Sequence, residues 1–114
     1  MKKRLIASYD EINDTFVGKV DGEFGFSADY GISDGIFLGI NKYNIPTSIF
    51  VPNASKALNT SKNTLECADV KILIDCDDIC LYFSICIEDL IIYSTKCFNS
   101  FNIPNINFLI DSNY

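Results

Sequence analysis

The sequence has 114 residues but no histidine and no tryptophan, and it contains no long uninterrupted apolar run. Without histidine, Ser-His-Asp and Cys-His catalytic groups and all His-containing metal sites are excluded. The longest apolar-rich stretch, 79–92, is interrupted by Ser84, Glu88 and Asp89, so no segment is predicted to span a bilayer. The apolar run after Met1–Arg4 is too short for a secretory signal. We therefore expect a cytoplasmic protein that makes no membrane contact.

Basic residues are also scarce, with nine Lys and Arg against fifteen Asp and Glu, a net charge of −6. This balance argues against direct nucleic-acid binding, which needs a basic face to neutralise phosphates. With 48% hydrophobic residues, the chain is too apolar for a disordered acidic tail. Residues 1–57 have a net charge of −1 and residues 58–114 one of −5. The sequence thus predicts an ordered domain whose acidity lies mainly in its second half.

The first half has the hydrophobic period of β-strands and no helical period. Phe24, Phe26 and Ala28 alternate with small or polar residues, which predicts a half-buried strand with core aromatic side chains. Pro46 fixes the start of the last strand and predicts that this strand lies at a sheet edge. The strands expected here are 5–9, 15–20, 24–28, 36–40 and 47–51.

The second half begins with 53–68, the only segment with helical signals, where Asn53, Ser55 or Ser61 can cap a short helix. A hairpin with Asp77-Asp78 as its loop is expected next, because this register sorts the apolar side chains onto one face. It pairs Cys76 with Ile79, although a wider loop that shifts the pairing by a residue pair is left open.

A second hairpin is expected at Glu88-Asp89, with Ile87 opposite Leu90. Three antiparallel strands in a meander result from these two turns. In the tail, Ile106, Phe108 and Ile110 alternate with Asn105, Asn107 and Leu109, which suits one last strand. We therefore predict a single mainly β (β-rich α+β) domain over 1–114, with two antiparallel meanders joined by one short helix. Its parts are a meander at 1–52, a helix at 53–68, and a meander with the tail strand at 69–114.

Two acidic groups are candidates for a divalent metal in a carboxylate-dependent hydrolase: Asp75–Asp78, and Asp10 with Glu11 and Asp14. Neither has the ligand spacing of a calcium loop, and acidic residues are ordinary in turns. We therefore predict no metal, no cofactor and no catalytic residue.

All five cysteines lie in the second half, and reduced thiols are expected in the cytoplasm. Cys76, Cys80 and Cys86 are candidates for zinc, but Cys76 and Cys80 point to opposite faces in the predicted register. The second hairpin places Cys97 directly across from Cys80, which suggests a pair that oxidation can join. A nucleophilic cysteine lacks an activating histidine.

Residues 9–14, Tyr-Asp-Glu-Ile-Asn-Asp, and residues 53–58, Asn-Ala-Ser-Lys-Ala-Leu, resemble the two ends of a small bacterial and archaeal domain of unknown function. Members of that family begin with Tyr-Asp-x-x-x-Asp and close with a strand that runs into Asn-Ala-Ser-Lys. The resemblance covers about residues 5–58. It implies a compact β-sheet domain without catalytic residues to transfer. Some relatives are thought to lie beside toxin genes, which implies an antitoxin-like or inhibitor role.

The sequence predicts a non-enzymatic protein-binding domain, and we expect it to inhibit a basic nucleic-acid-handling protein such as a toxin or a defence nuclease. Complementary charge speeds docking to a basic partner, and the second half supplies that charge. The alternatives are the metal hydrolase and a structural homo-oligomer, such as a homodimer that pairs sheet edges or the tail strand. The partner surface is expected at the hairpin tips, at Asp75, Asp77, Asp78, Glu88 and Asp89.

Overall fold

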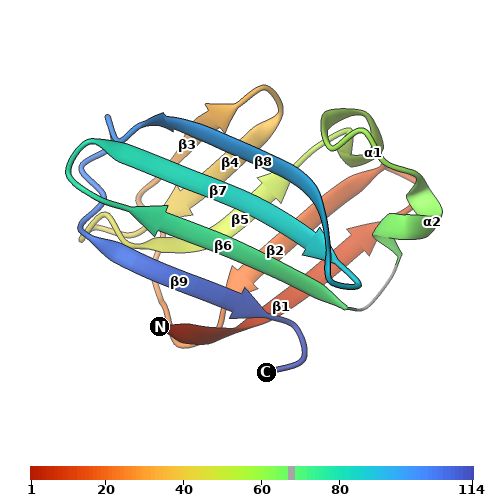
Figure 1. The fold of residues 1–114 in the computed structure, drawn as a ribbon, viewed down its shortest axis with the longest axis horizontal. Coiled ribbons are helices and arrows are strands. Elements are labelled where there is room, and N and C mark those ends of the chain that lie inside the picture. Colours follow the sequence, from red (N-terminus) through yellow and green to blue (C-terminus); the bar gives the residue numbers. More distant parts are fainter. Residues whose placement is uncertain (67–68) are drawn as a thin grey trace.

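The computed structural model describes residues 1–66 and 69–114, and in these ranges it has nine strands and two single-turn helices (Figure 1). The elements of the first half are β1 (Lys2–Asp10), β2 (Thr15–Val20), β3 (Ala28–Ser33), β4 (Ile36–Ile40), β5 (Pro46–Val51) and α1 (Ala54–Ala57). Those of the second half are α2 (Lys62–Leu65), β6 (Val70–Cys76), β7 (Cys80–Ile87), β8 (Leu90–Phe98) and β9 (Ile106–Asp111). The protein is mainly β, as the sequence predicts.

The strands form one sheet in the order β3-β4-β5-β2-β1-β9-β6-β7-β8. β1 and β9 are parallel, and the other neighbours are antiparallel. The sheet folds into two layers, with β1–β5 in one and β6–β9 in the other (Figure 1). Its two edge strands meet where the side chains of Ser33 and Tyr93 form a hydrogen bond. Close by, the rings of Tyr30 and Phe101 stack with centroids 4.7 Å apart. The sheet is therefore nearly closed.

The core lies between the two layers and draws on both halves of the chain. Its largest fully buried side chains include Ile36, Leu38, Ile49, Leu58, Ile72, Ile74, Phe83, Ile85 and Ile110. Burial of one such side chain stabilises the fold by about 1.5–3 kcal/mol relative to its exposure. Because these side chains pack into one cluster, each layer depends on the other for its stability.

The strands expected at 15–20 and 36–40 are confirmed. β5, however, lies between β4 and β2, so the prediction of an edge position for it is wrong. Pro46 is tolerated in this interior strand because it is the first residue and pairs with Ile40 at an irregularity of the β4–β5 ladder. Bulges and strand starts are the places where a sheet accepts a residue without an N–H.

The prediction of a strand at 24–28 with buried aromatic side chains is also wrong. Phe24 and Phe26 are 80% and 68% exposed, and both lie in the loop between β2 and β3. Gly22 and Gly25 have φ of 86° and 94°. Glycine adopts these angles without strain, and they interrupt the extended backbone that a strand requires.

The segment expected to be one short helix has two separate turns in its described part, α1 and α2. Asn53 precedes α1 with φ of 49° and makes no side-chain capping bond. Asn59 also has φ of 49°, and a left-handed residue at this place ends a helix. Ser61 then begins α2, because its hydroxyl accepts a 3.1 Å hydrogen bond from the Thr64 N–H. The remainder of the expected helix, 67–68, is outside the described residues.

β6, β7 and β8 form the predicted antiparallel meander. The first loop is wider than Asp77-Asp78, since Cys76 pairs with Leu81 and not with Ile79. This shift by a residue pair leaves the side chains of β6 and β7 on their predicted faces, because the period of a strand is two residues. Ile72, for example, is fully buried as that face requires. Ile79, which is expected on the core face, lies in the loop instead and is 66% exposed.

The second hairpin has Ile87 opposite Leu90, as predicted. A bulge between Ile85 and Cys86 then shifts the register of the rest of β8. Cys97 consequently lies opposite the residue that follows Cys80, so the predicted direct pairing of these two cysteines is wrong.

β9 has Phe108 and Ile110 buried, as its alternation predicts. It lies between β1 and β6, however, and its pairing with β1 joins Lys2 to Leu109. Because β9 returns to β1 and β5 returns to β2, the strands form one continuous sheet and not two separate meanders. Among the described residues, no helix has both the length and the apolar character that a membrane crossing needs.

Candidate functional site

All odd-numbered strands run in one direction and all even-numbered strands in the other. The turns 10–15, 33–36 and 87–90, both helices and the chain after β9 therefore lie at one end of the sheet (Figure 1). We call this the helix end. Its parts touch, since Gly35 lies directly against Ala57 and the Lys62 Nζ donates a 3.3 Å hydrogen bond to the Glu11 carbonyl.

The net charge is concentrated at the helix end. Among the described residues, nine acidic and five basic side chains belong to it: Asp10, Glu11, Asp14, Asp34, Glu66, Asp69, Glu88, Asp89 and Asp111, with Lys2, Arg4, Lys56, Lys62 and Lys71. Lys2 and Arg4 are counted here because Lys2 forms an ion pair with Asp111 and Arg4 lies opposite Asp111 in the β1–β9 ladder. The opposite end has six acidic and four basic side chains: Asp21, Glu23, Asp29, Asp75, Asp77 and Asp78, with Lys3, Lys19, Lys42 and Lys96. The helix end therefore carries the larger share of the negative charge.

Asp14 connects the β1–β2 turn to α1. Its carboxylate accepts hydrogen bonds from the Ser55 hydroxyl at 2.6 Å, the Ser55 backbone N–H at 3.0 Å and the Tyr9 hydroxyl at 2.6 Å. Its own carbonyl accepts a 2.7 Å bond from the Ala54 N–H. The bonds from Ser55 and Tyr9 lower the pKa of Asp14. Burial, and then the bond to Asp14, raise the pKa of Tyr9 far above its ordinary value. The two segments that carry the family resemblance are therefore bonded to each other.

Glu11 and Glu66 bring two carboxyl groups together at the exposed rim of the helix end. The hydrogen bond that Glu66 shares with the Glu11 carboxyl, and then the charge of Glu11, raise the pKa of Glu66. Asp10 behaves differently, since its carboxylate accepts bonds from Asn13 Nδ2 at 2.7 Å and from the Ile12 N–H at 3.0 Å. These bonds, those from Asn13 first, lower the pKa of Asp10.

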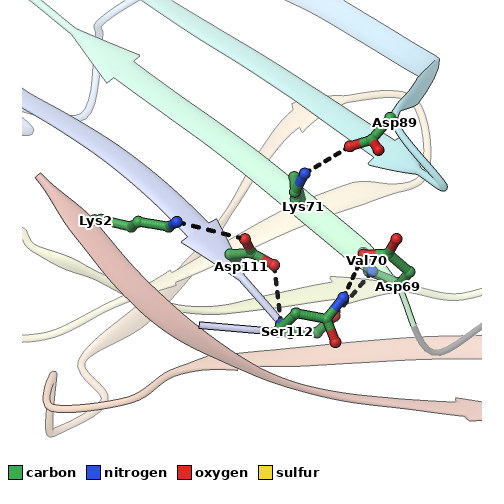
Figure 2. A network of polar contacts seen from close by, with 8 residues as sticks. Lys2, Asp69, Val70, Lys71, Asp89, Asp111 and Ser112 are labelled. Atoms are coloured by element: carbon green, nitrogen blue, oxygen red, sulfur yellow. Dashed lines mark hydrogen bonds and ion pairs between the residues drawn. The ribbon is translucent and has the colours of Figure 1, made fainter.

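The β7–β8 turn carries Glu88 and Asp89, two of the predicted partner-binding residues. Their φ angles are 52° and 63°, so both central residues of this tight turn are left-handed. The Asp89 carboxylate accepts a 2.6 Å hydrogen bond from the Lys71 Nζ on β6 (Figure 2). This bond raises the pKa of Lys71. The turn is therefore fixed to β6 next to the helices.

Asp75, Asp77 and Asp78, the other predicted partner-binding residues, lie at the opposite end of β7 from Glu88 and Asp89 (Figure 1). The Asp77 carboxylate closes its own turn by accepting bonds from the Cys80 N–H at 2.7 Å and the Ile79 N–H at 2.8 Å. The structure thus divides the predicted acidic surface into two groups at opposite ends of β7.

A cleft of about 650 Å³ lies at the helix end between β1 on one side and α2 with the start of β6 on the other. Arg4 lies towards one end of the cleft and Glu66 towards the other, beside Tyr9. The buried side chains of Phe16 and Leu65 form apolar walls.

Burial raises the pKa of two of the described cysteine thiols. Cys76, Cys80, Cys86 and Cys97 are free thiols, and Cys76 is buried. Burial raises the pKa of Cys76 to about 12, and it also raises the pKa of Cys97. A thiol with such a high pKa supplies little thiolate near neutral pH.

The acidic groups considered for a metal are spread apart or engaged. Asp10 and Asp14 bind to different backbone and side-chain donors, as described above, and Asp77 closes its own turn. Within residues 1–66 and 69–114, no three Cys, Asp or Glu side chains are grouped so that they could hold a metal ion.

No family model, curated protein or solved structure matches this chain with significance. The description of its site therefore depends on its own geometry.

Sequence reasoning identified Glu88 and Asp89 but missed most of the helix end. It treated Asp10, Glu11 and Asp14 only as metal candidates, and it assigned no role to Asp34 or to residues along β1. The paired segments at 9–14 and 53–58 were a usable signal, since both proved to lie at this end. No local sequence pattern indicated the cleft, because the cleft exists where β9 ends beside β1.

Proposed function

We propose that this chain is a non-enzymatic protein-binding domain whose helix end binds and inhibits a basic protein that handles nucleic acids. The observation that carries the proposal is the excess of nine acidic over five basic side chains among the described residues of the helix end. An acidic surface concentrated in this way attracts a basic partner over distance and orients its approach. An inhibitor of this kind covers the basic surface that otherwise binds phosphates.

The scaffold supports such a role because it holds the acidic turns in fixed positions. Asp14 joins the first turn to α1, and Asp89 is bonded to Lys71 on β6. Asp34 and Glu11 are exposed between these anchors. A rigid surface loses little conformational entropy on binding, so more of the interaction energy is kept as affinity. An antitoxin-like role agrees with the resemblance of residues 5–58.

A structural homo-oligomer is the second candidate, and one observation favours it. The edge strand β8 exposes Leu90, Ile91 and Phe98, whose side chains are 68%, 59% and 77% accessible. The tail strand β9 does not offer such a surface, because Phe108 and Ile110 are buried in the core. Light scattering of the purified protein across a concentration series tests this alternative, which requires a mass above that of one chain.

The proposed function is tested with two variants that change the net charge equally at different ends. The helix-end variant is Glu11→Gln/Asp34→Asn/Glu66→Gln/Asp89→Asn. The matched control is Asp21→Asn/Asp29→Asn/Asp75→Asn/Asp78→Asn. Each is used to capture proteins from lysate of the source cells, and the affinity of the captured protein is then measured at low and at high salt.

We expect the wild type and the control to capture the same basic protein and the helix-end variant to bind it at least about ten-fold more weakly. Binding should weaken as salt screens the exposed charges. Equal loss of affinity in both variants would show that net charge, and not the helix end, is responsible. A captured protein that is neither basic nor salt-sensitive would contradict the proposal.

A further inference from the structure

One side of β1 has no strand partner beyond Arg4 among the described residues. β1 pairs with β9 only as far as Arg4, whereas its pairing with β2 continues to Asp10. β9 ends at Asp111, and the chain then turns onto β6, where Ser112 and Val70 exchange two hydrogen bonds of 2.9 Å (Figure 2). This turn leaves an open edge of β1 beside the cleft.

The open backbone groups on this edge follow from the ladder with β2. The Arg4 carbonyl accepts a 2.9 Å hydrogen bond from the Asp21 N–H, so the even-numbered residues of β1 bond to β2. Ala7 and Tyr9 consequently direct their N–H and C=O groups to the open side. Residues two apart on a strand repeat about every 6.7 Å, which is the spacing that an extended peptide presents.

The side chains along the edge also leave space for a strand. Ala7 is on the same face as the buried Leu5, but Ala7 is exposed because the cleft lies next to it. A strand placed beside Ala7 would bring one of its side chains against Phe16 and Leu65, which line the cleft. The site thus combines a row of backbone donors and acceptors with an apolar wall.

We propose that this cleft binds an extended segment of a partner protein, which adds to the sheet as a strand alongside Ala7 and Tyr9. Arg4 towards one end and Glu11 and Glu66 towards the other give the site an electrostatic direction. The segment therefore has an apolar residue in its middle, an acidic residue towards Arg4 and a basic residue towards Glu66. Its affinity comes mainly from main-chain hydrogen bonds. Glu11 and Glu66 also belong to the acidic surface proposed above, so the Ala7 variants and the response to salt distinguish the two contacts.

A second copy of this chain does not suit the cleft. Its own β1 edge lies in the same cleft beside α2, and β1 is an interior strand of the sheet. A single extended segment has no such obstacle.

The test begins with selection of a phage-displayed library of random linear peptides on the folded protein. Enriched peptides are synthesised, and their affinities are measured by fluorescence polarisation at low and at high salt. Hydrogen exchange of the backbone amides of Ala7 and Tyr9 is followed with and without peptide. We expect enrichment of the predicted pattern, slower exchange at both amides, and an affinity that changes little with salt.

Two variants locate the site. Ala7→Pro removes one open N–H without removing a bond to β2, and Ala7→Trp fills the cleft but keeps that N–H. Both should weaken peptide binding at least about ten-fold, whereas Ser8→Ala, which changes only a side chain on the other face, should leave it unchanged. Circular dichroism shows which variants are folded, and Ala7→Trp remains decisive if Ala7→Pro is not.

Several results would overturn the proposal. These are a library that enriches no peptide, peptides that bind Ala7→Trp as tightly as the wild type, and protection of Ala7 and Tyr9 that arises from dimer formation without peptide. Failure here would not contradict the charge-driven interaction, because the test of the latter also varies Asp34 and Asp89, which do not line the cleft, and reads salt dependence.

Discussion

Ser55 and Asp14 are 41 residues apart in the chain, yet the Ser55 hydroxyl donates a 2.6 Å hydrogen bond to Asp14 Oδ2. Asp14→Asn and Ser55→Ala should each lower Tm by several degrees, since each loses bonds that connect the first turn to α1. The decrease in Tm of the double variant should be smaller than the sum of the two single decreases, because both changes remove the same hydrogen bond. Thermal melting by circular dichroism measures these values. Additive losses would show that the two residues act separately, and Asp34→Asn is the control for a charge change at an exposed position.

Stability should decrease in acid, and Asp10, Asp14 and Asp77 are the causes. Hydrogen bonds lower the pKa of all three carboxyl groups in the folded protein below the ordinary value of 3.8. Their contribution is therefore complete above pH 3.8, and it is lost as the pH falls through their folded pKa values. Tm should decrease steeply below about pH 4. In Asp14→Asn the decrease should be smaller, and an identical acid profile would contradict the role of Asp14.

Glu66 should have the opposite effect. Its pKa is raised in the folded protein by the neighbouring Glu11, so ionisation as the pH rises above 4.5 destabilises the fold. Glu66→Gln should raise Tm by a few degrees at neutral pH and have no effect below pH 4.5. Glu11→Gln is the matched variant. The Tm of the double variant should be little higher than that of either single variant. A stabilisation that persists in acid would point to a cause other than charge.

The β7–β8 turn should be a site for stabilisation. Glu88 and Asp89 both have positive φ, which costs a residue with a side chain about 1 kcal/mol relative to glycine. Replacement by Asn-Gly, the preferred sequence of this turn, should raise the free energy of unfolding by about 1 kcal/mol. The exposed ion pair of Asp89 with Lys71 contributes less than this. Urea unfolding measures the change, with Asp89→Asn as the control for the lost charge.

Cys76 and Cys97 should react slowly with iodoacetamide. Burial raises the pKa of both thiols, that of Cys76 to about 12. At pH 8 we expect alkylation of Cys76 to be at least about ten-fold slower in the folded protein than in urea, because thiolate is the reactive form. Peptide mapping by mass spectrometry follows each site. Equal rates in the folded and unfolded protein would contradict the burial of Cys76.

Local patterns predicted most of the strands, although not β3, and they did not predict which strands are neighbours in the sheet. Alternation of apolar residues placed β2, β4 and the β6–β8 meander, because one face of each strand packs on the core. The positions of β5 and β9 depend on pairings between distant segments, such as Lys2 with Leu109, which no local pattern contains. The bulge at Cys86 had the same effect on a smaller scale, since one extra residue moved Cys97 away from its predicted partner.

The candidate site was predicted only in part for a related reason. The charge along the chain pointed to the second half. In the folded protein, however, Glu88 lies at the same end of the sheet as Asp34 and Glu11 from the first half. Asp75 and Asp77 are close to Glu88 in the sequence, yet the length of β7 separates them. Phe24 and Phe26 show the limit of alternation itself, because glycines with positive φ placed them in an exposed loop.

The parallel pairing of β1 with β9 also sets an order of events during synthesis. β1 can pair with β2 as soon as both are synthesised, because they are close in the sequence. The first residues of β1 pair with β9, which is synthesised about a hundred residues later, as the pairing of Lys2 with Leu109 shows. Until then this stretch is an unpaired strand edge, which other chains can join. Lys2, Lys3 and Arg4 occupy it. Three adjacent cations repel a second copy of themselves, so they protect the newly made chain from aggregation at the place that β9 finally covers.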